Sequence, residues 1–229
     1  MFPMNELLFI GSVLFFLGSV LLIYRLFGRS GLFVFTAFAT LLANIQVCKT
    51  VTIFGLSTTA GNVLYASTFL VTDILSEKYG KKEAGKAVKY GLAVTLLWVI
   101  GTQLTLLFIP NENDYIHPSL QVVFGLVPRV AFASLAGYVI SQSLDVFLYH
   151  FIWSRTGGTK SGLWIRNNGS TLTSQAVDTL IFTFLAFWGV YPTPVFLSIL
   201  GTTYLFKAVV ALLDTPFIYL ARKLKPLED

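Results

Sequence analysis

The chain has 229 residues, of which 55% are apolar and only 12% are charged. A soluble domain usually carries about a quarter charged residues, so this chain has too few to coat a globule of its size. Its 15% of aromatic residues, its lack of a Gly-X-Y period and its single cysteine exclude disorder, a collagen-like chain and a disulfide scaffold. The composition instead predicts that lipid surrounds most of the chain.

Long apolar runs define the predicted elements. A helix that crosses a membrane needs about 20 mostly apolar residues, because the hydrocarbon is about 30 Å thick and a helix rises 1.5 Å per residue. The sequence predicts seven such helices, at 6–26, 31–49, 60–77, 88–109, 128–152, 169–189 and 195–221. We therefore expect an all-α membrane protein, built as a bundle of about seven transmembrane helices.

Two segments do not fit a plain helix. Residues 49–62 (KTVTIFGLSTTAGN) are rich in Thr, Val and Gly, which favours a hairpin or a re-entrant piece at the membrane surface. Residues 119–127 precede Pro128, which suits the first turn of a helix better than its interior. We expect residues 119–127 to lie at the interface.

The basic residues predict the orientation. Thirteen of the sixteen Lys and Arg fall on alternate loops, and these are Arg25, Arg29, Lys78, Lys81, Lys82, Lys86, Lys89, Arg155, Lys160, Arg166, Arg222, Lys223 and Lys225. By the positive-inside rule the N-terminus is outside and the C-terminus is cytoplasmic, in a multi-pass protein of the cytoplasmic (inner) membrane. The net charge of +5 then reflects topology and anionic lipid rather than a nucleic-acid partner.

Ionisable residues inside the spans are the main functional signal, because a charge at mid-membrane costs at least about 2.5–3.5 kcal/mol. The clearest pattern is an internal echo: Ser-Gln-x-x-Asp occurs twice, with Gln142 before Asp145 and Gln175 before Asp178. The two helices run in opposite directions, so both acids are expected at a similar depth. Either at least one acid faces a ligand, or the Ser and Gln side chains merely hydrogen-bond one helix to the other.

Five further polar positions are candidates, and four of them have two interpretations each. Lys207 and Asp214 lie two turns apart on one face of the last helix, and Lys207 either neutralises one of the two acids above or meets a ligand or coupling ion. Arg129 either snorkels to the outer surface or takes part in gating. Asp73 either pairs with the neighbouring lysines or gates the inner mouth, and Asp214 is grouped with these ion-pair or gating residues. Asn44 is either a contact between helices or part of a ligand site.

Motifs for chemistry are weak or missing. Gly80 to Lys86 fits the phosphate-loop spacing GxxxxGK, but Ala87 follows in place of the Ser or Thr that would hold magnesium. The motifs HExxH and GxSxG do not occur. The Asn-Gly-Ser sequence at 168–170 is interpreted as the start of the sixth helix, with its Asn or Ser as N-cap. We expect no enzyme activity, no cofactor and no metal.

With these residues in view, the chain resembles the queuosine precursor transporter family, also called the vitamin uptake transporter family, over roughly residues 40 to 221. The resemblance rests on several separated matches: Ala43-Asn44-Ile45 with Lys49, residues 68–73 (TFLVTD) running into Glu77-Lys78-Tyr79-Gly80, residues 129–134 (RVAFAS), both echoes, Asp178-Thr179-Leu180 followed by Ala186-Phe187-Trp188, and Phe206-Lys207. Similar proteins typically have six spans. The resemblance therefore implies an extra N-terminal transmembrane helix at 1–29 and a six-helix transporter domain at 30–229.

The resemblance implies uptake of a queuosine precursor for tRNA modification: 7-cyano-7-deazaguanine, its aminomethyl form or queuine. The edge of such a guanine-like ring has an amide N–H and an amino group that a carboxylate accepts bidentately, and the ring faces stack on aromatic side chains. Amide side chains suit the carbonyl and ring nitrogens, and a lysine offsets the acids or meets the carbonyl. The expected substrate-binding set is Asp145, Asp178, Gln142, Gln175, Asn44 and Lys207.

Other functions stay open on the sequence. One is the substrate-binding subunit of an energy-coupling-factor vitamin transporter, which would need a partner ATPase. Another is a membrane enzyme, which would need a nucleophile or metal cluster that the sequence does not offer. The expected partners are a small nucleobase, the lipid membrane and, through Gly11 and Gly18 on the first helix, a second copy in a homodimer.

Overall fold

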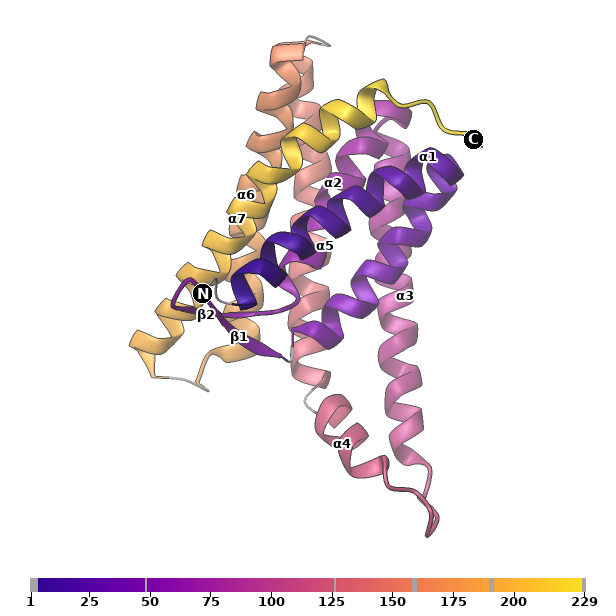
Figure 1. Cartoon of the computed structure of the whole chain (residues 1–229), viewed down its shortest axis with the longest axis vertical. Helices are drawn as coiled ribbons and strands as arrows, with labels where there is room; N and C mark the ends of the chain where they lie inside the picture. The colour runs from indigo at the N-terminus through magenta and orange to yellow at the C-terminus, as the bar shows by residue number, and fades with distance from the viewer. Residues whose placement is uncertain (1–3, 48, 126, 158–159, 190–191, 228–229) are drawn as a thin grey trace.

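The computed structural model of the chain describes residues 4–47, 49–125, 127–157, 160–189 and 192–227 (Figure 1). Within these residues the chain forms seven α-helices and one β-hairpin, with these bounds: α1 Met4–Gln46, β1 Thr50–Ile53, β2 Leu56–Thr59, α2 Asn62–Tyr79, α3 Lys81–Leu107, α4 His117–Gly125, α5 Val127–Thr156, α6 Lys160–Phe187 and α7 Thr193–Lys223. The prediction of an all-α membrane bundle is confirmed. The first two predicted spans are the two halves of α1, and the other five are α2, α3, α5, α6 and α7.

α1 consists of two helices that meet at Gly28. Gly28 has φ +54° and ψ −136°, a backbone conformation that residues with a Cβ rarely adopt. The two halves turn back on each other at this residue (Figure 1). The first half shares the hydrophobic core of the bundle through one face, which buries Phe9, Val13, Leu17, Val20 and Tyr24.

The hairpin of β1 and β2 follows α1, in the segment that the sequence predicted as a hairpin or a re-entrant piece. Phe54 and Gly55 form its two-residue turn, with φ +51° and +75°. Positive φ at both turn residues is what a tight hairpin turn matching the twist of the strands requires. The backbone N–H of Phe54 donates to Glu6 Oε1 at 2.7 Å, which fastens the hairpin to the start of α1.

α2 lies at the centre of the bundle. Fourteen of its eighteen residues are buried, and it contacts α1, α3, α5, α6 and α7. By length and composition, α1, α3, α5 and α7 are apolar enough to cross a membrane. α2 and α6 carry more polar residues, which is tolerated in a membrane when those residues face other helices instead of lipid.

Two helices begin earlier than predicted. α3 starts at Lys81, directly after Gly80, so most of the expected lysine loop is helical, since Lys and Glu are good helix formers. α6 starts at Lys160, so the predicted N-cap at 168–170 is wrong. Asn168 lies inside the helix, and its side-chain amide exchanges two hydrogen bonds with the hydroxyl of Thr215 on α7, at 2.9 and 3.2 Å.

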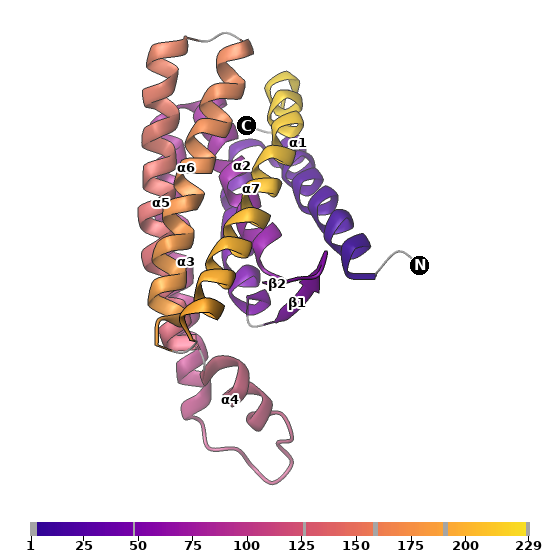
Figure 2. The ribbon, with the colours of Figure 1, turned by 90° about the vertical axis from the view of Figure 1, so that its left-hand side faces the viewer.

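α5 and α6 are antiparallel neighbours along most of their length (Figure 2). α2 contacts both of them, and α7 contacts α2 and α6. The polar positions that the sequence singled out lie on these four helices, except Asn44, which is on α1. α4 is a short helix without a buried residue, and it occupies the segment expected at the interface.

Candidate functional site

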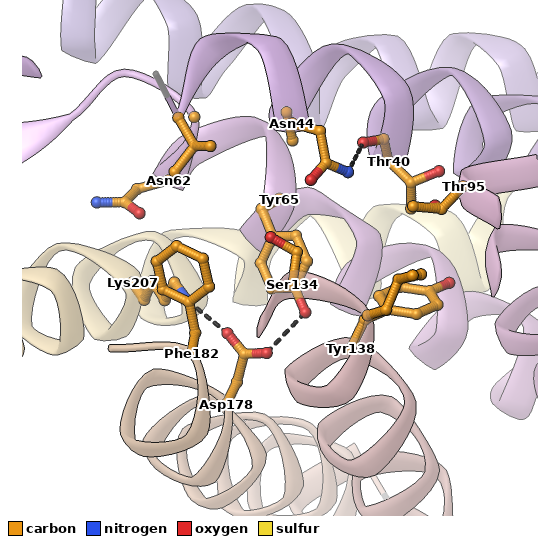
Figure 3. A pocket seen from close by; sticks show the side chains of 14 residues that line it. Thr40, Asn44, Asn62, Tyr65, Thr95, Ser134, Tyr138, Asp178, Phe182 and Lys207 are labelled. Carbon is orange, nitrogen blue, oxygen red and sulfur yellow. Dashed lines mark hydrogen bonds and ion pairs between the residues drawn. The ribbon is translucent and has the colours of Figure 1, made fainter. Parts of the chain in front are cut away.

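A cavity lies between α2 and the helices that contact it, α1, α3, α5, α6 and α7 (Figure 3). Its empty space of about 540 Å³ includes the part that is open to the surroundings. Its lining comprises Thr40, Ala43, Asn44, Val47, Gly61, Asn62, Tyr65, Thr95, Ser134, Leu135, Tyr138, Asp178, Phe182 and Lys207. Three of the six residues predicted to bind substrate, Asn44, Asp178 and Lys207, are in this set.

Asp178 and Lys207 form a buried ion pair in the wall of the cavity. The Nζ atom of Lys207 lies 2.5 Å from Asp178 Oδ2, and the two residues are only 4% and 2% exposed. The ammonium group also lies 4.8 Å from the centre of the Tyr65 ring, within the range of a cation–π contact. Of the partners that the sequence left open for Lys207, the structure selects Asp178.

The second oxygen of the Asp178 carboxylate is held by two hydroxyl groups. Tyr65 donates to Asp178 Oδ1 at 2.7 Å, and Ser141 donates to the same atom at 3.1 Å. Gly137 makes room for this oxygen, because a Cβ at that position would lie 2.9 Å from it. The serine of the first Ser-Gln-x-x-Asp echo thus donates a hydrogen bond to the acid of the second echo. Side chains from α2, α5 and α7 together orient the carboxylate.

Aromatic rings form much of the remaining wall. Asp178 points up from α6 toward Lys207 and Tyr65, with Phe182 and Tyr138 on either side of it (Figure 3). The hydroxyl of Tyr138 is buried and has no hydrogen-bond partner among the described residues. This hydroxyl packs so closely against α3 that a Cβ at Gly91 would overlap its oxygen.

Asp145 does not line the cavity, so the two acids of the echo do not face one common chamber. Its Oδ1 lies 3.4 Å from the hydroxyl of Thr171, which also contacts Asp73 Oδ2 at 3.2 Å. Asp214 accepts a hydrogen bond from Asn167 at 2.9 Å. Asp73, Asp145 and Asp214, all at most 1% exposed, form a second polar cluster that we call the acid cluster.

Gln142 and Gln175 also lie away from the cavity lining. Gln142 is fully buried and donates to the hydroxyl of Thr68 at 2.8 Å, so it joins α5 to α2. Gln175 is fully buried as well, and neither its amide nitrogen nor its amide oxygen has a partner within the described chain. The two glutamines are therefore interior groups of the bundle in this conformation.

Arg129 lies in the first turn of α5 and is exposed. Its Nε donates to the carbonyl of Leu185 at 2.9 Å and its Nη2 to that of Trp188 at 2.7 Å. These carbonyls lie at the C-terminal end of α6, where a basic side chain satisfies groups that have no partner inside the helix.

An ion pair between Glu77 and Arg166 was not predicted. Arg166 was expected in the loop between the fifth and sixth helices, but it lies inside α6 and is fully buried, because Glu77 pairs with it. Its Nη2 lies 2.7 and 2.8 Å from the two carboxylate oxygens, and its guanidinium group lies 4.5 Å from the Trp153 ring. Arg222 Nε also contacts Glu77, at 3.3 Å, so one carboxylate connects α2, α6 and α7.

Several residues of the cavity gave no signal in the sequence. Tyr65, Tyr138 and Phe182 are three of many aromatic residues, and nothing in their spacing sets them apart. Within the described residues, no group of three or more His, Cys, Asp or Glu side chains is arranged to hold a metal ion.

Comparisons with known proteins agree on one family. A family described as "Putative vitamin uptake transporter" matches residues 59–221. The "Probable queuosine precursor transporter" of Bacillus subtilis (strain 168) is 47% identical over 210 residues, which cover 92% of this chain and 91% of that protein. The "Queuosine precursor transporter" of Escherichia coli (strain K12) is 27% identical over 147 residues, or 64% of this chain and 62% of that protein. No solved structure matches the chain.

Proposed function

This chain belongs to the queuosine precursor transporter family, and on that premise we propose that it carries a 7-deazaguanine across the cytoplasmic membrane for tRNA modification. The compounds in question are 7-cyano-7-deazaguanine, its aminomethyl form and queuine. The observation that carries the proposal is the buried pair of Lys207 and Asp178 in the wall of the cavity, because it presents N–H donors directly beside carboxylate acceptors.

This arrangement complements the edge of a guanine-like ring. That edge offers a carbonyl oxygen, then a ring N–H, then an amino group. We assign the carbonyl oxygen to the ammonium group of Lys207, which has three donors and gives one of them to Asp178. The ring N–H goes to Asp178 Oδ2, which has one lone pair left after the contact with Lys207. The amino group reaches Oδ1 only in place of one of the two hydroxyl groups that donate to it, those of Tyr65 and Ser141.

The flat ring would stack on the aromatic walls. Tyr65, Tyr138 and Phe182 all line the cavity, and stacking of a base on an aromatic side chain is worth about 1–3 kcal/mol. Asn44 reaches the cavity from α1 and is placed to meet a ring nitrogen or a substituent. Gln142, Gln175 and Asp145 act behind the cavity rather than on the ligand.

We further propose that the ligand enters from outside the cell. The positive-inside rule applied to the loops rich in Lys and Arg supports an orientation with the N-terminus outside and the C-terminus in the cytoplasm. On that orientation the pair of Glu77 and Arg166 closes the cytoplasmic end of the bundle, and the hairpin lies at the outer end. Release into the cell then requires the contacts of Glu77 with α6 and α7 to part.

Ligand binding to the purified protein tests the function. Titration calorimetry should detect 7-cyano-7-deazaguanine and should not detect adenine, which reverses the donor and acceptor order of this edge. Riboflavin and biotin test the alternative of a different vitamin. In cells that cannot make 7-deazaguanine, expression of the chain should restore queuosine in tRNA when the precursor is supplied. Binding of riboflavin or biotin in place of the 7-deazaguanine would overturn the proposal.

A further inference from the structure

We propose that the acid cluster of Asp73, Asp145 and Asp214 is a proton-binding site, separate from the ligand cavity, through which the proton gradient drives uptake. The inference rests on the proposed function, since it concerns what powers the transport of the same ligand. It is carried by a count of hydrogen-bond donors and acceptors inside the cluster, and by polar groups around it that have no partner.

Asp145 has few donors for a carboxylate: the hydroxyl groups of Thr72, Thr171 and Ser170, the last of which also donates to the carbonyl of Asn167 at 3.3 Å. Its Oδ2 lies 3.4 Å from the hydroxyl of Thr72, but the single proton of that hydroxyl is directed to the carbonyl of Phe69, at 2.9 Å. Its Oδ1 lies 3.4 Å from the hydroxyl of Thr171, which it shares with Asp73. One hydroxyl proton cannot serve two acids. Both contacts are satisfied together when Asp145 or its neighbour carries a proton and donates it.

Two further oxygen atoms of the cluster have no partner among the described residues: Asp73 Oδ1 and Asp214 Oδ2. A charged oxygen buried without a donor is very unfavourable, and neutralisation by a proton removes that penalty. Three carboxylates packed against one another also repel if all are ionised. The cluster therefore holds fewer than three negative charges.

Neighbouring polar groups indicate that the cluster receives a ligand of its own. Asn167 is fully buried and donates from Nδ2 to Asp214 Oδ1, while its own Oδ1 has no partner in the described chain. A carbonyl oxygen next to an acid accepts the proton of the acid directly or through a water molecule. The unpaired oxygens of Asp73, Asp214 and Asn167 can therefore accept a hydrogen bond within the cluster only when one of the acids carries a proton.

Within the part of the chain that the structure describes, no Lys or Arg side chain forms an ion pair with the acid cluster. The titratable groups that face it from the surrounding helices are Asp73 and Glu77 on α2, Asp145 and Tyr149 on α5, Arg166 on α6, and Asp214 and Arg222 on α7. The basic members of this set, Arg166 and Arg222, both contact Glu77. Lys207, two turns along α7 from Asp214 and toward the cavity, is paired with Asp178.

The cluster and the cavity are built on the same helices. Asp178 and Thr171 lie seven residues apart on α6, and Lys207 and Asp214 lie seven residues apart on α7, which is two turns or about 10 Å. On α5, Ser141 holds the cavity acid, and Asp145 follows one turn later. A shift of α6 or α7 that accompanies ligand binding must therefore change the contacts of the acid cluster.

Transport into liposomes tests the inference. The full-length protein is reconstituted, and uptake of labelled 7-cyano-7-deazaguanine is followed with a pH gradient, with a sodium gradient and with neither. With one proton per ligand, a gradient of one pH unit, acidic outside, supports accumulation of up to about tenfold. We expect Asp145→Asn and Asp73→Asn to keep ligand exchange without a gradient and to lose accumulation. Asp114→Asn, in an exposed loop, is the matched control and should accumulate ligand as the wild type does.

The possible results separate this inference from the proposed function. If the wild type binds ligand but accumulates it only with a sodium gradient, or if Asp145→Asn still responds to the pH gradient, the proton site is wrong and the transporter stands. If the wild type binds no 7-deazaguanine, the function itself is wrong. Proton uptake or release by the wild type on ligand binding, followed in weak buffer with a pH dye, needs no variant. A change of zero would overturn the proton site even if the Asn variants fail to fold.

Discussion

The ammonium group of Lys207 lies 2.5 Å from Asp178 Oδ2, at a position in the bundle where neither residue is more than 4% exposed. Two opposite charges that are buried away from water attract each other strongly, but burial also removes their hydration. Such a pair contributes little net stability compared with two apolar residues, whereas loss of one partner is very costly. A buried pair that faces a cavity is thus better explained by what it binds than by the stability it adds.

Asp178→Asn removes the charge that balances Lys207. Because Lys207 then keeps an unpaired buried charge, we expect a loss of about 3–5 kcal/mol in the free energy of unfolding. The double variant Asp178→Asn, Lys207→Met removes both charges and should recover most of this stability while binding no 7-cyano-7-deazaguanine. Thermal unfolding and titration calorimetry of the purified proteins measure the two effects. Ligand binding by the double variant at the wild-type affinity would contradict the assigned role of the pair.

Tyr65→Phe keeps the ring in the cavity wall and removes the hydroxyl that donates to Asp178 at 2.7 Å. A hydrogen bond to a charged group is worth about 1.5–3 kcal/mol, so we expect a loss of that size in stability. Tyr138→Phe is the matched control, since the hydroxyl of Tyr138 has no partner among the described residues and its removal should not lower stability. Equal destabilisation by both variants would show that the hydrogen bond from Tyr65 to Asp178 does not stabilise the protein.

Gly137→Ala tests the close approach of α5 to the carboxylate. The added Cβ would lie 2.9 Å from Asp178 Oδ1, so the carboxylate must move away from Ser141 and Tyr65. We expect weaker ligand binding and lower stability. Gly101→Ala, at an exposed position inside α3 with open space around it, should instead stabilise the helix by up to about 1 kcal/mol. A Gly137→Ala protein that binds ligand as tightly as the wild type would indicate that the carboxylate can shift freely.

The predictions that the structure confirms are mostly those that depend on the residues of a single segment. The apolar runs predicted the helices, and the composition of residues 49–62 predicted the hairpin whose turn is Phe54–Gly55. The echo predicted that α5 and α6 meet through polar side chains, as the bond from Ser141 to Asp178 confirms.

The choice of partners between helices could not be read in the same way. It depends on how each helix is rotated about its axis, and a rotation by one residue, 100°, exchanges one face for another. Periodicity therefore did not show that Lys207 meets Asp178 rather than Asp145. It also could not show that Tyr65 on α2 reaches the same carboxylate, 113 residues away. The contact of Glu77 with Arg166 spans 89 residues and turns a loop cation into a buried one.

Arg166→Lys should loosen the end of the bundle at which Arg166 pairs with Glu77, although it keeps the positive charge. The guanidinium group of Arg166 contacts both oxygens of Glu77 and lies over the Trp153 ring, and a lysine cannot reproduce the planar fork or the stacking. We expect a loss of about 1–3 kcal/mol in stability and faster hydrogen exchange in the last turns of α5 and the first turns of α6. Arg155→Lys is the matched control, because Arg155 is exposed near the end of α5 and the same exchange of side chains should change stability little. Unchanged exchange in Arg166→Lys would mean that charge alone, without the two-point contact, holds α2 against α6.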